Sequence, residues 1–259
     1  MDDINVLVIT DNNFIYKEFL RIIGEKNYNN VNFHFVCSKV SPPSPLEKEG
    51  LNAVRLNDMM DEIKESYQLI ISLHCKQIFS KEVLQSVRCI NVHPGYNPYN
   101  RGWYPQVFSI MNKYPVGVTI HEIDEQLDHG LIIVRERVPI KSSDTSYDIY
   151  LRILNKEIEL LTKHLEDIIH NRYTMIEPEG EGNINYKEDF NKLCEFNLSE
   201  QTTTGDIINR LRALTFNGYN NAYFIDETGQ KIFMEIRLKT DESPSSSTGG
   251  GAIRKESGR

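Results

Sequence analysis

The side chains best suited to chemistry gather in two short segments of the chain. Residues 90–103, INVHPGYNPYNRGW, place Asn91 and His93 two positions apart where an expected strand ends in a Pro/Gly/Asn loop. Residues 117–133, GVTIHEIDEQLDHGLII, complete another expected strand and carry Asp128 shortly before a glycine. Together they supply an amide, an imidazole and a carboxylate, a set suited to the transfer of an acyl group to an amine.

Each of the three groups meets one requirement of such a transfer. An amide N–H can stabilise the oxygen that becomes negative when an amine attacks a formyl carbon. Imidazole, with a reference pKa of about 6.5, can accept the proton that the amine loses, and a nearby carboxylate can fix its tautomer. Side chains alternate along a strand, so Asn91 and His93 share one face. Taken singly, a strand-end His is more often structural, and an Asp near a Gly is ordinarily a turn residue.

Length, charge and cysteine content limit the other classes of function. The chain has 259 residues, which allow one large domain and a small appendage. Its formal net charge of −8 argues against a uniform basic surface for nucleic acid. We expect no signal peptide and no membrane span, because the N-terminus is acidic and the apolar runs are short. Four scattered cysteines favour neither a zinc ribbon nor a disulfide framework, and indicate a cytoplasmic protein.

Strand-like and helix-like segments alternate through the first half of the chain. This alternation predicts βαβ units and an α/β fold with a doubly wound, mostly parallel sheet. TDNNF follows the first strand in place of a glycine-rich fingerprint, so the pattern does not by itself indicate a dinucleotide site. The expected strands are 4–9, 31–37, 69–73, 89–92, 116–123 and 131–138, and the expected helices are 14–25 and 143–171.

A change of composition divides the chain near residue 180. Residues 177–182, EPEGEG, predict a linker. We therefore expect a catalytic domain over 1–180 and a small α+β appendage over 181–241, with a helix at 204–214 and a hairpin of 222–226 and 231–238. Residues 242–259 are rich in Ser and Gly and are expected to be a flexible tail, of natural or artificial origin.

The two chemical motifs resemble those of the 10-formyltetrahydrofolate-dependent formyltransferases, over about residues 4–175. In that family pattern Asn91 and His93 match the catalytic Asn and His. Asp128, in a DxGxI frame completed by Gly130 and Ile132, matches the catalytic Asp. The resemblance implies a Rossmann-like fold and 10-formyltetrahydrofolate as co-substrate.

Two further segments resemble the sugar N-formyltransferases within this family. They are HCKQIF at 74–79 and NPYNRGW at 97–103. The resemblance implies an acceptor amine on a nucleotide-linked amino-deoxy sugar such as dTDP-4-amino-4,6-dideoxyglucose, a role in surface polysaccharide (O-antigen) synthesis, and a homodimer. It also implies that the pterin of the folate lies between two loops, whose candidate residues are Gln77, Ile78, Phe79, Ile123, Asp124 and Leu127.

The candidate sugar-nucleotide residues come from three parts of the chain. Arg101 has a guanidinium that suits a diphosphate, and Lys76 offers a point charge. Asn100 and Trp103 lie in the same motif as Arg101, and Phe216 and Tyr219 could stack on a base. Packing in a core is an open alternative for the apolar and aromatic candidates, namely Ile78, Phe79, Trp103, Phe216 and Tyr219.

Four alternatives compete with sugar formylation. A metal site at His93, His121, Asp128 and His129 is disfavoured, because the histidines lack the i, i+4 helical spacing of a preformed pair. Glycinamide ribonucleotide fits the extra C-terminal region poorly, and methionyl-tRNA would need a basic docking surface. Residues 181–241 instead hold seven Lys or Arg and ten Asp or Glu, a net charge of 7 − 10 = −3. A non-catalytic folate or nucleotide-binding protein is the alternative outside the enzymes.

Overall fold

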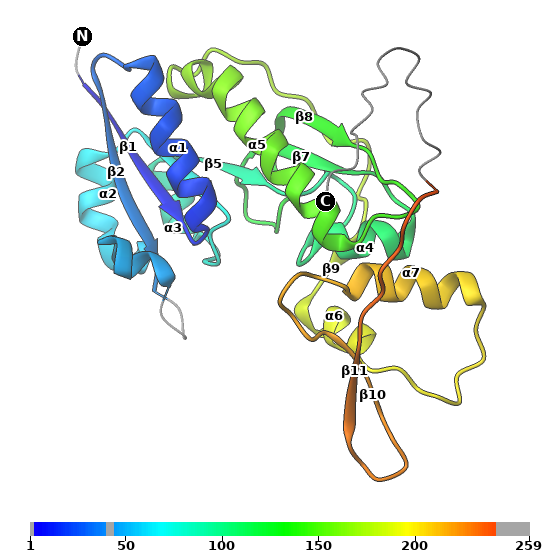
Figure 1. The fold of residues 1–259 in the computed structure, drawn as a ribbon. Helices are drawn as coiled ribbons and strands as arrows, with labels where there is room; N and C mark the ends of the chain where they lie inside the picture. The colour runs from blue at the N-terminus through cyan, green and yellow to red at the C-terminus, as the bar shows by residue number, and fades with distance from the viewer. Residues whose placement is uncertain (1–2, 40–43, 242–259) are drawn as a thin grey trace, which may run out of the picture.

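The computed structural model describes residues 3–39 and 44–241. The tail expected at 242–259 lies outside these residues. The strands and helices alternate along the first half of the chain (Figure 1). In order they are β1 (Ile4–Thr10), α1 (Asn13–Lys26), β2 (Val31–Ser38), η1 (Pro45–Glu49), β3 (Asn52–Val54), η2 (Leu56–Met59), α2 (Met60–Ser66), β4 (Leu69–Leu73), α3 (Lys81–Ser86), β5 (Arg88–His93), β6 (Arg101–Gly102), α4 (Pro105–Asn112), β7 (Val116–Glu122), β8 (Ile132–Val138), α5 (Ser146–Ile169), β9 (Ile184–Asn185), α6 (Lys187–Cys194), α7 (Thr204–Leu214), β10 (Ala222–Ile225) and β11 (Lys231–Met234).

A seven-stranded sheet forms the body of the molecule, in the order β3-β2-β1-β4-β5-β7-β8. The strands from β3 to β5 are parallel, whereas β7 pairs antiparallel with β5 and β8 antiparallel with β7. The expected doubly wound, mostly parallel sheet is therefore confirmed. Because β1, β4 and β5 run side by side in the same direction, their carboxyl ends meet at one edge of the sheet.

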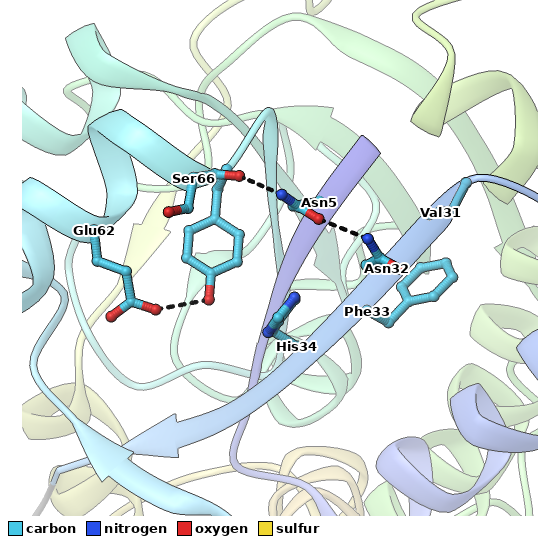
Figure 2. Close-up of a pocket in the computed structure, with 8 residues that line it drawn as sticks. Asn5, Val31, Asn32, Phe33, His34, Glu62 and Ser66 are labelled. Carbon is cyan, nitrogen blue, oxygen red and sulfur yellow. Dashed lines mark hydrogen bonds between the residues drawn. The ribbon is translucent and has the colours of Figure 1, made fainter. Parts of the chain in front are cut away.

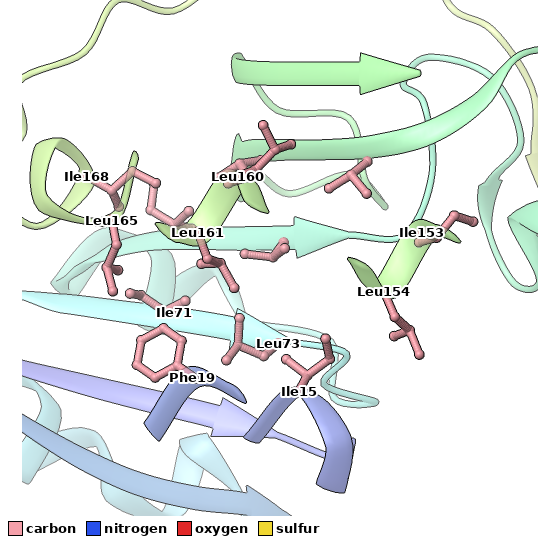
Figure 3. Close-up of a cluster of buried hydrophobic side chains, with 14 of the residues drawn as sticks. Ile15, Phe19, Ile71, Leu73, Ile153, Leu154, Leu160, Leu161, Leu165 and Ile168 are labelled. Atoms are coloured by element: carbon pink, nitrogen blue, oxygen red, sulfur yellow. The ribbon is translucent and has the colours of Figure 1, made fainter. Parts of the chain in front are cut away.

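Alternate residues of the central strands pack into two apolar layers, one on each face of the sheet. Val6 and Val8 of β1 face the layer that contains α1 and α5, whereas Leu7 and Ile9 face the layer under α2 and α3. Figure 3 shows the first layer, in which side chains of α1 and α5 meet those of the sheet. Burial on both faces explains why these strands are continuous apolar runs in the sequence.

Helix α5 is the longest element, and its start is set by a capping box. The side chain of Thr145 accepts from the N–H of Asp148, and the Asp148 carboxylate accepts from the N–H of Thr145. The helix therefore begins at Ser146, three residues later than the sequence predicts. Asp144, an expected cap candidate, instead accepts from Arg152 at 2.6 and 2.7 Å.

The segment expected to be a linker runs back against the NPYNRGW loop. β9 pairs in parallel with β6, so Ile184 and Asn185 lie beside Arg101 and Gly102. Gly182 has a φ of +61°, and a Cβ there would lie 1.8 Å from the carbonyl oxygen of Pro98. Only glycine fits this close approach, so the turn after the linker is built against the loop.

The C-terminal appendage consists of α6, α7 and the hairpin of β10 and β11, which projects away from the body of the molecule (Figure 1). Arg212 of α7 anchors it, because its guanidinium donates to the carbonyl oxygens of Asp144 and Lys141 at 2.7 and 2.8 Å. Among the described residues, no helix combines the length and the hydropathy needed to cross a membrane.

Candidate active site

The structure places Asn91, His93 and Asp128 together at the carboxyl end of β5. Asn91 lies opposite His121 of β7 in the antiparallel ladder, and His93 lies opposite Thr119. Asp128 comes from the loop between β7 and β8 and has a φ of +48°. A positive φ is uncommon for a residue other than glycine, so the loop is held in a specific conformation that points this carboxylate at β5.

Three hydrogen bonds fix the position of the Asp128 residue, and His93 lies beside its carboxylate. Its Oδ1 accepts from the amide Nδ2 of Asn91 at 3.0 Å, and its Oδ2 accepts from the backbone N–H of Gly102 at 3.0 Å. Its own carbonyl oxygen accepts from Nδ2 of Asn97 at 2.8 Å. His93 Nδ1 lies 3.5 Å from Oδ2. The carboxylate thus connects β5 to the NPYNRGW loop.

His93 is buried, and one of its ring nitrogens has no partner. Nδ1 faces Asp128, whereas Nε2 is inaccessible and makes no hydrogen bond with any described residue. Burial lowers the pKa of His93 to about 4, although the Asp128 carboxylate acts in the opposite direction. The ring is therefore neutral at neutral pH. With Nδ1–H directed at the carboxylate, Nε2 presents a free lone pair.

Burial by itself would raise the pKa of Asp128, but its neighbours outweigh burial. The proximity of His93, contacts with His121 and the N–H of Gly102 together hold the pKa of Asp128 below its ordinary value. Asp128 is therefore an anion beside a neutral imidazole. That arrangement stabilises an imidazolium when His93 accepts a proton.

The amide of Asn91 contacts a fourth residue, His121, which the sequence indicates only as a candidate metal ligand. His121 Nδ1 lies 2.7 Å from the carbonyl oxygen of Glu122, which identifies Nδ1 as the protonated nitrogen. Its Nε2 is then an acceptor, 3.3 Å from Nδ2 of Asn91. Strand alternation could have identified this residue. Applied to residues 117–123, it places His121 and Thr119 on the same face of their strand.

Gly95 makes room for the His93 ring. A Cβ at this position would lie 2.3 Å from Nε2 of His93 and 2.7 Å from its Cδ2. The loop backbone at Gly95 is held by Thr119, whose hydroxyl donates to its carbonyl oxygen at 2.8 Å. The glycine therefore lets the chain turn directly over the nitrogen that has no partner.

The two loops proposed to hold a pterin lie side by side. Phe79 and Ile123 belong to the same apolar cluster, and Lys81 forms an ion pair with Glu125 at 2.8 Å across the two loops. Phe79 is buried, as the core alternative predicts, but Ile78 is 88% exposed and is not a core residue.

The remaining pterin candidates shape their loops. Gln77 donates from Nε2 to the carbonyl oxygen of Val54 at 2.7 Å, so its side chain braces the loop. Asp124 accepts from His129 Nδ1 at 2.8 Å. Leu127 is 39% exposed. Ile78 and Leu127 are thus apolar side chains that these loops leave open to solvent.

Two of the predicted substrate residues are buried in the NPYNRGW loop. The Asn100 side chain is fully buried and is bonded to Ser109, Asn112 and Asn183. Arg101 is 4% exposed and donates to the carbonyl oxygens of Leu127 and Glu181. In this structure both residues brace the loop, because the segment after the linker covers them.

The other substrate candidates remain accessible. Trp103 is 39% exposed, with the ammonium of Lys187 5.7 Å from its ring, and Lys76 is exposed. Phe216 is half-buried, and Tyr219 is 67% exposed beside it, with 5.6 Å between the ring centroids. The Trp103 and Phe216 side chains are therefore only partly buried, and packing in a core does not explain the whole of either.

The described residues contain no group of three potential metal ligands. His129, one of the expected set, is paired with Asp124 instead. A cavity of about 670 Å³ lies elsewhere, at the amino ends of β1 and β2, where Asn5, His34 and Tyr67 contribute to its lining (Figure 2). It is at the opposite edge of the sheet from His93, so it is separate from the candidate site.

Comparison with known proteins gives consistent matches over nearly the whole chain. A family model described as "Formyl transferase" matches residues 25–165, and one described as "N-formyltransferase dimerization C-terminal domain" matches residues 189–240. The chain is 41% identical over 238 residues to a dTDP-4-amino-4,6-dideoxyglucose formyltransferase of Mycobacterium tuberculosis, across 92% of this chain and 97% of the relative.

Solved structures agree with these matches. A 4-N formyltransferase from Francisella tularensis has a TM-score of 0.85 at 42% identity, covering 91% of this chain and 98% of that one. An N-formyltransferase from Helicobacter canadensis, solved with folinic acid and dTDP-3-aminofucose, shares the fold at 22% identity, with a TM-score of 0.68 and coverage of 85% and 83%.

Proposed function

The chain belongs to the formyl transferase family, and from this premise we propose that it formylates the amine of a nucleotide-linked amino-deoxy sugar. The formyl donor is 10-formyltetrahydrofolate and the acceptor is dTDP-4-amino-4,6-dideoxyglucose. The observation that carries the proposal is the free Nε2 of buried His93 beside the ionised Asp128. The relative from Mycobacterium tuberculosis, named for that sugar and similar over almost its whole length, supports the choice of acceptor.

His93 acts as the general base, which requires the turn at Gly95 that covers Nε2 to move aside when the substrates bind. Bound 10-formyltetrahydrofolate supplies the formyl group that the amine attacks. Nε2 of His93 accepts the proton that the attacking nitrogen loses, directly or through one water. The bond between the formyl carbon and N10 of the folate then breaks, and N10 leaves with a proton as part of tetrahydrofolate. Asp128 holds the Nδ1–H tautomer and stabilises the imidazolium that results, since it lies 3.5 Å from Nδ1.

Asn91 stabilises the formyl oxygen as negative charge develops on it. Its amide has two hydrogens, one bonded to Asp128 at 3.0 Å and one directed at His121 at 3.3 Å. The contact with His121 is the longer, so it is the one that yields to the substrate oxygen. Such a donor typically contributes about 10²–10³ in rate.

The pterin lies between the loop of Gln77, Ile78 and Phe79 and the loop of Ile123 and Leu127. The exposed Ile78 and Leu127 side chains suit the flat faces of the pterin, whose amino, carbonyl and ring-nitrogen groups lie along its polar edge. The nucleotide sugar approaches from the side of Lys76 and Trp103, with its base near Phe216 and Tyr219. Asn100 and Arg101 take part indirectly, by bracing the loop.

The decisive experiment incubates the protein with 10-formyltetrahydrofolate and a set of amino-sugar nucleotides, and follows each by mass spectrometry. We expect dTDP-4-amino-4,6-dideoxyglucose to gain one formyl group. Glycinamide ribonucleotide and methionyl-tRNA are assayed in parallel, and formylation of either in place of the sugars would show that the acceptor is wrong. Binding of folate and sugar without any transfer would identify a non-catalytic binding protein.

We further propose a homodimer built through the hairpin of β10 and β11. Phe233 and Ile225 on this hairpin are 47% and 41% exposed, and the segment lies within the match to the dimerization domain.

Residues 1–180 form the catalytic domain and 181–241 the appendage. The enzyme works in the cytoplasm and supplies formamido sugars for surface polysaccharide. The test is a strain from which the gene has been deleted, whose polysaccharide should lack the formamido sugar.

A further inference from the structure

A chain of hydrogen bonds beside the proposed site joins α1, β4 and α5. Asn12 precedes α1, His74 follows β4, and Tyr150 and Glu157 lie on α5. Asn12 Nδ2 donates to the hydroxyl oxygen of Tyr150 at 2.9 Å and lies 3.3 Å from Nδ1 of His74. His74 Nε2 lies 2.9 Å from both carboxylate oxygens of Glu157. The mechanism described above uses none of these four residues.

The cap of α1 fixes the direction of every bond in this network. Asn12 Oδ1 accepts from the N–H groups of Phe14 and Ile15 at 3.0 and 3.2 Å. The amide nitrogen of Asn12 must therefore point the other way, as a donor to Tyr150 and His74. Nδ1 of His74 is then an acceptor, so its proton is on Nε2 and is donated to Glu157.

Glu157 shows that the network is a built feature. It is fully buried, and burial raises its pKa, although the hydrogen bond from His74 acts in the opposite direction. A buried carboxylate is costly unless it is bonded. His74 also has a φ of +56°, an uncommon conformation for a residue that is not glycine. Proteins tolerate a buried carboxylate and a strained backbone of this kind where the two hold neighbouring groups in place.

What the network holds is the hydroxyl of Tyr150. This oxygen accepts a hydrogen bond from Asn12, and no described residue accepts the hydroxyl hydrogen in return. Burial raises the pKa of Tyr150 to about 12, so the hydroxyl keeps its hydrogen. Tyr150 is therefore an oriented donor with no acceptor in the described protein.

Tyr150 lies between the two ends of the proposed substrate site. β1, β4 and β5 are neighbours, so Asn12 and His74 lie at the same sheet edge as His93, at about 5 Å per strand. On its other side, the Tyr150 ring is 5.5 Å from that of Phe216, which in turn contacts Tyr219. An extended nucleotide sugar with its amine at His93 and its base at Phe216 has its diphosphate in between.

We propose that Tyr150 is a specificity-determining residue that donates its hydroxyl hydrogen to a phosphoryl oxygen of the nucleotide sugar, held in place by Asn12, His74 and Glu157. A phosphoryl oxygen only accepts hydrogen bonds, so it matches a donor whose oxygen is already occupied. The inference rests on the proposed function, because it assumes a nucleotide-sugar acceptor.

The test is Tyr150→Phe, which keeps the ring against Phe216 and removes the hydroxyl. We expect the KM for the amino-sugar nucleotide and the Kd for dTDP to rise roughly 10- to 100-fold, the range for losing a hydrogen bond to a charged group. The KM for 10-formyltetrahydrofolate and the melting temperature should not change. Tyr28→Phe is the matched control, because the Tyr28 hydroxyl is buried and bonds to none of the described residues.

His74→Asn tests the network, since Asn tolerates a positive φ but is too short to bridge Asn12 and Glu157. It should weaken dTDP binding, and the double variant with Tyr150→Phe should bind no more weakly than Tyr150→Phe alone. If His74→Asn does not fold, Tyr150→Phe still tests the role of the hydroxyl. If Tyr150→Phe binds dTDP as tightly as the wild type, the inference is wrong, whereas the proposed formylation activity is unaffected by that result. A wild-type protein that formylates no amino-sugar nucleotide would remove the proposed function, and the inference with it.

Discussion

The buried, neutral state of His93 makes a prediction about stability that is independent of activity. A histidine in the unfolded chain has a pKa of about 6.5, whereas burial lowers the folded-state pKa of His93 to about 4. Between these values the unfolded state binds the proton and the folded state does not. Stability should therefore fall as the pH drops from about 6.5 to about 4.

The magnitude follows from the separation of the two pKa values. Moving from about pH 7 to about pH 5 should cost about 2 kcal/mol of unfolding free energy from this one group. The full cost, near pH 4, is about 3 kcal/mol. Asp128 acts in a separate window, because its lowered pKa removes stability only as the pH falls below about 4.

The assay is urea denaturation of the wild type and His93→Gln at about pH 7 and about pH 5. Gln cannot take up the proton, so the variant should lose about 2 kcal/mol less than the wild type over this interval. Titrating groups away from His93 contribute equally to both proteins and cancel in the double difference, and Asp128 titrates below this pH interval. His170→Gln, which removes an exposed histidine just after α5, should behave as the wild type does.

Activity provides the second readout on the same protein. His93→Gln should fold, bind dTDP and lose about 10²–10⁴ in turnover, the usual contribution of a general base. A double difference near zero would show that His93 is not buried in the neutral form. A folded variant that keeps more than about a tenth of its turnover would remove His93 from the role of base.

Three further expectations follow from the site and the appendage. Asp128→Asn should lower kcat by at least about 10² with little change in folate KM, because the imidazolium loses its counter-charge; steady-state kinetics at saturating substrates would check this. Gly95→Ala should lower kcat while dTDP binding persists, since its Cβ would lie 2.3 Å from Nε2 of His93, and near-normal kcat would contradict that packing. Phe233→Glu should convert a dimer to a monomer in sedimentation velocity, because a charge is costly at the centre of an apolar interface; an unchanged dimer would place the interface elsewhere.

Most of the sheet could be predicted from the sequence, because strands buried on both faces are short, continuous apolar runs. The expected strand at 69–73 coincides with β4, and the expected helix at 204–214 with α7. The helices α2, α3, α4 and α6 went unpredicted, since each spans eight residues or fewer and shows too few turns for a periodic pattern. The pairing of β6 with β9 involves two residues on each side and leaves no signal in the sequence.

The catalytic candidates were accessible to sequence reasoning because two short motifs contain all three. The network of Asn12, His74, Tyr150 and Glu157 was not, since its bonded pairs are separated by up to 138 residues and only the folded chain brings them together. The burial of Asn100 had the same cause, because residues that follow the linker close over it. Spacing along the chain reveals groups that share a strand or a loop, whereas contacts between distant segments need the structure.

The return of the linker against the NPYNRGW loop has a consequence for recombining these enzymes. The segment between the two family matches, residues 166–188, contains Asn183, which bonds Asn100, and Gly182, which fits against Pro98. A chimera that joins the catalytic half of one relative to the appendage of another would separate these partners if the junction fell after Asn100 but before Gly182. The exchangeable unit is therefore the appendage without this segment, and the linker is inherited with the catalytic domain.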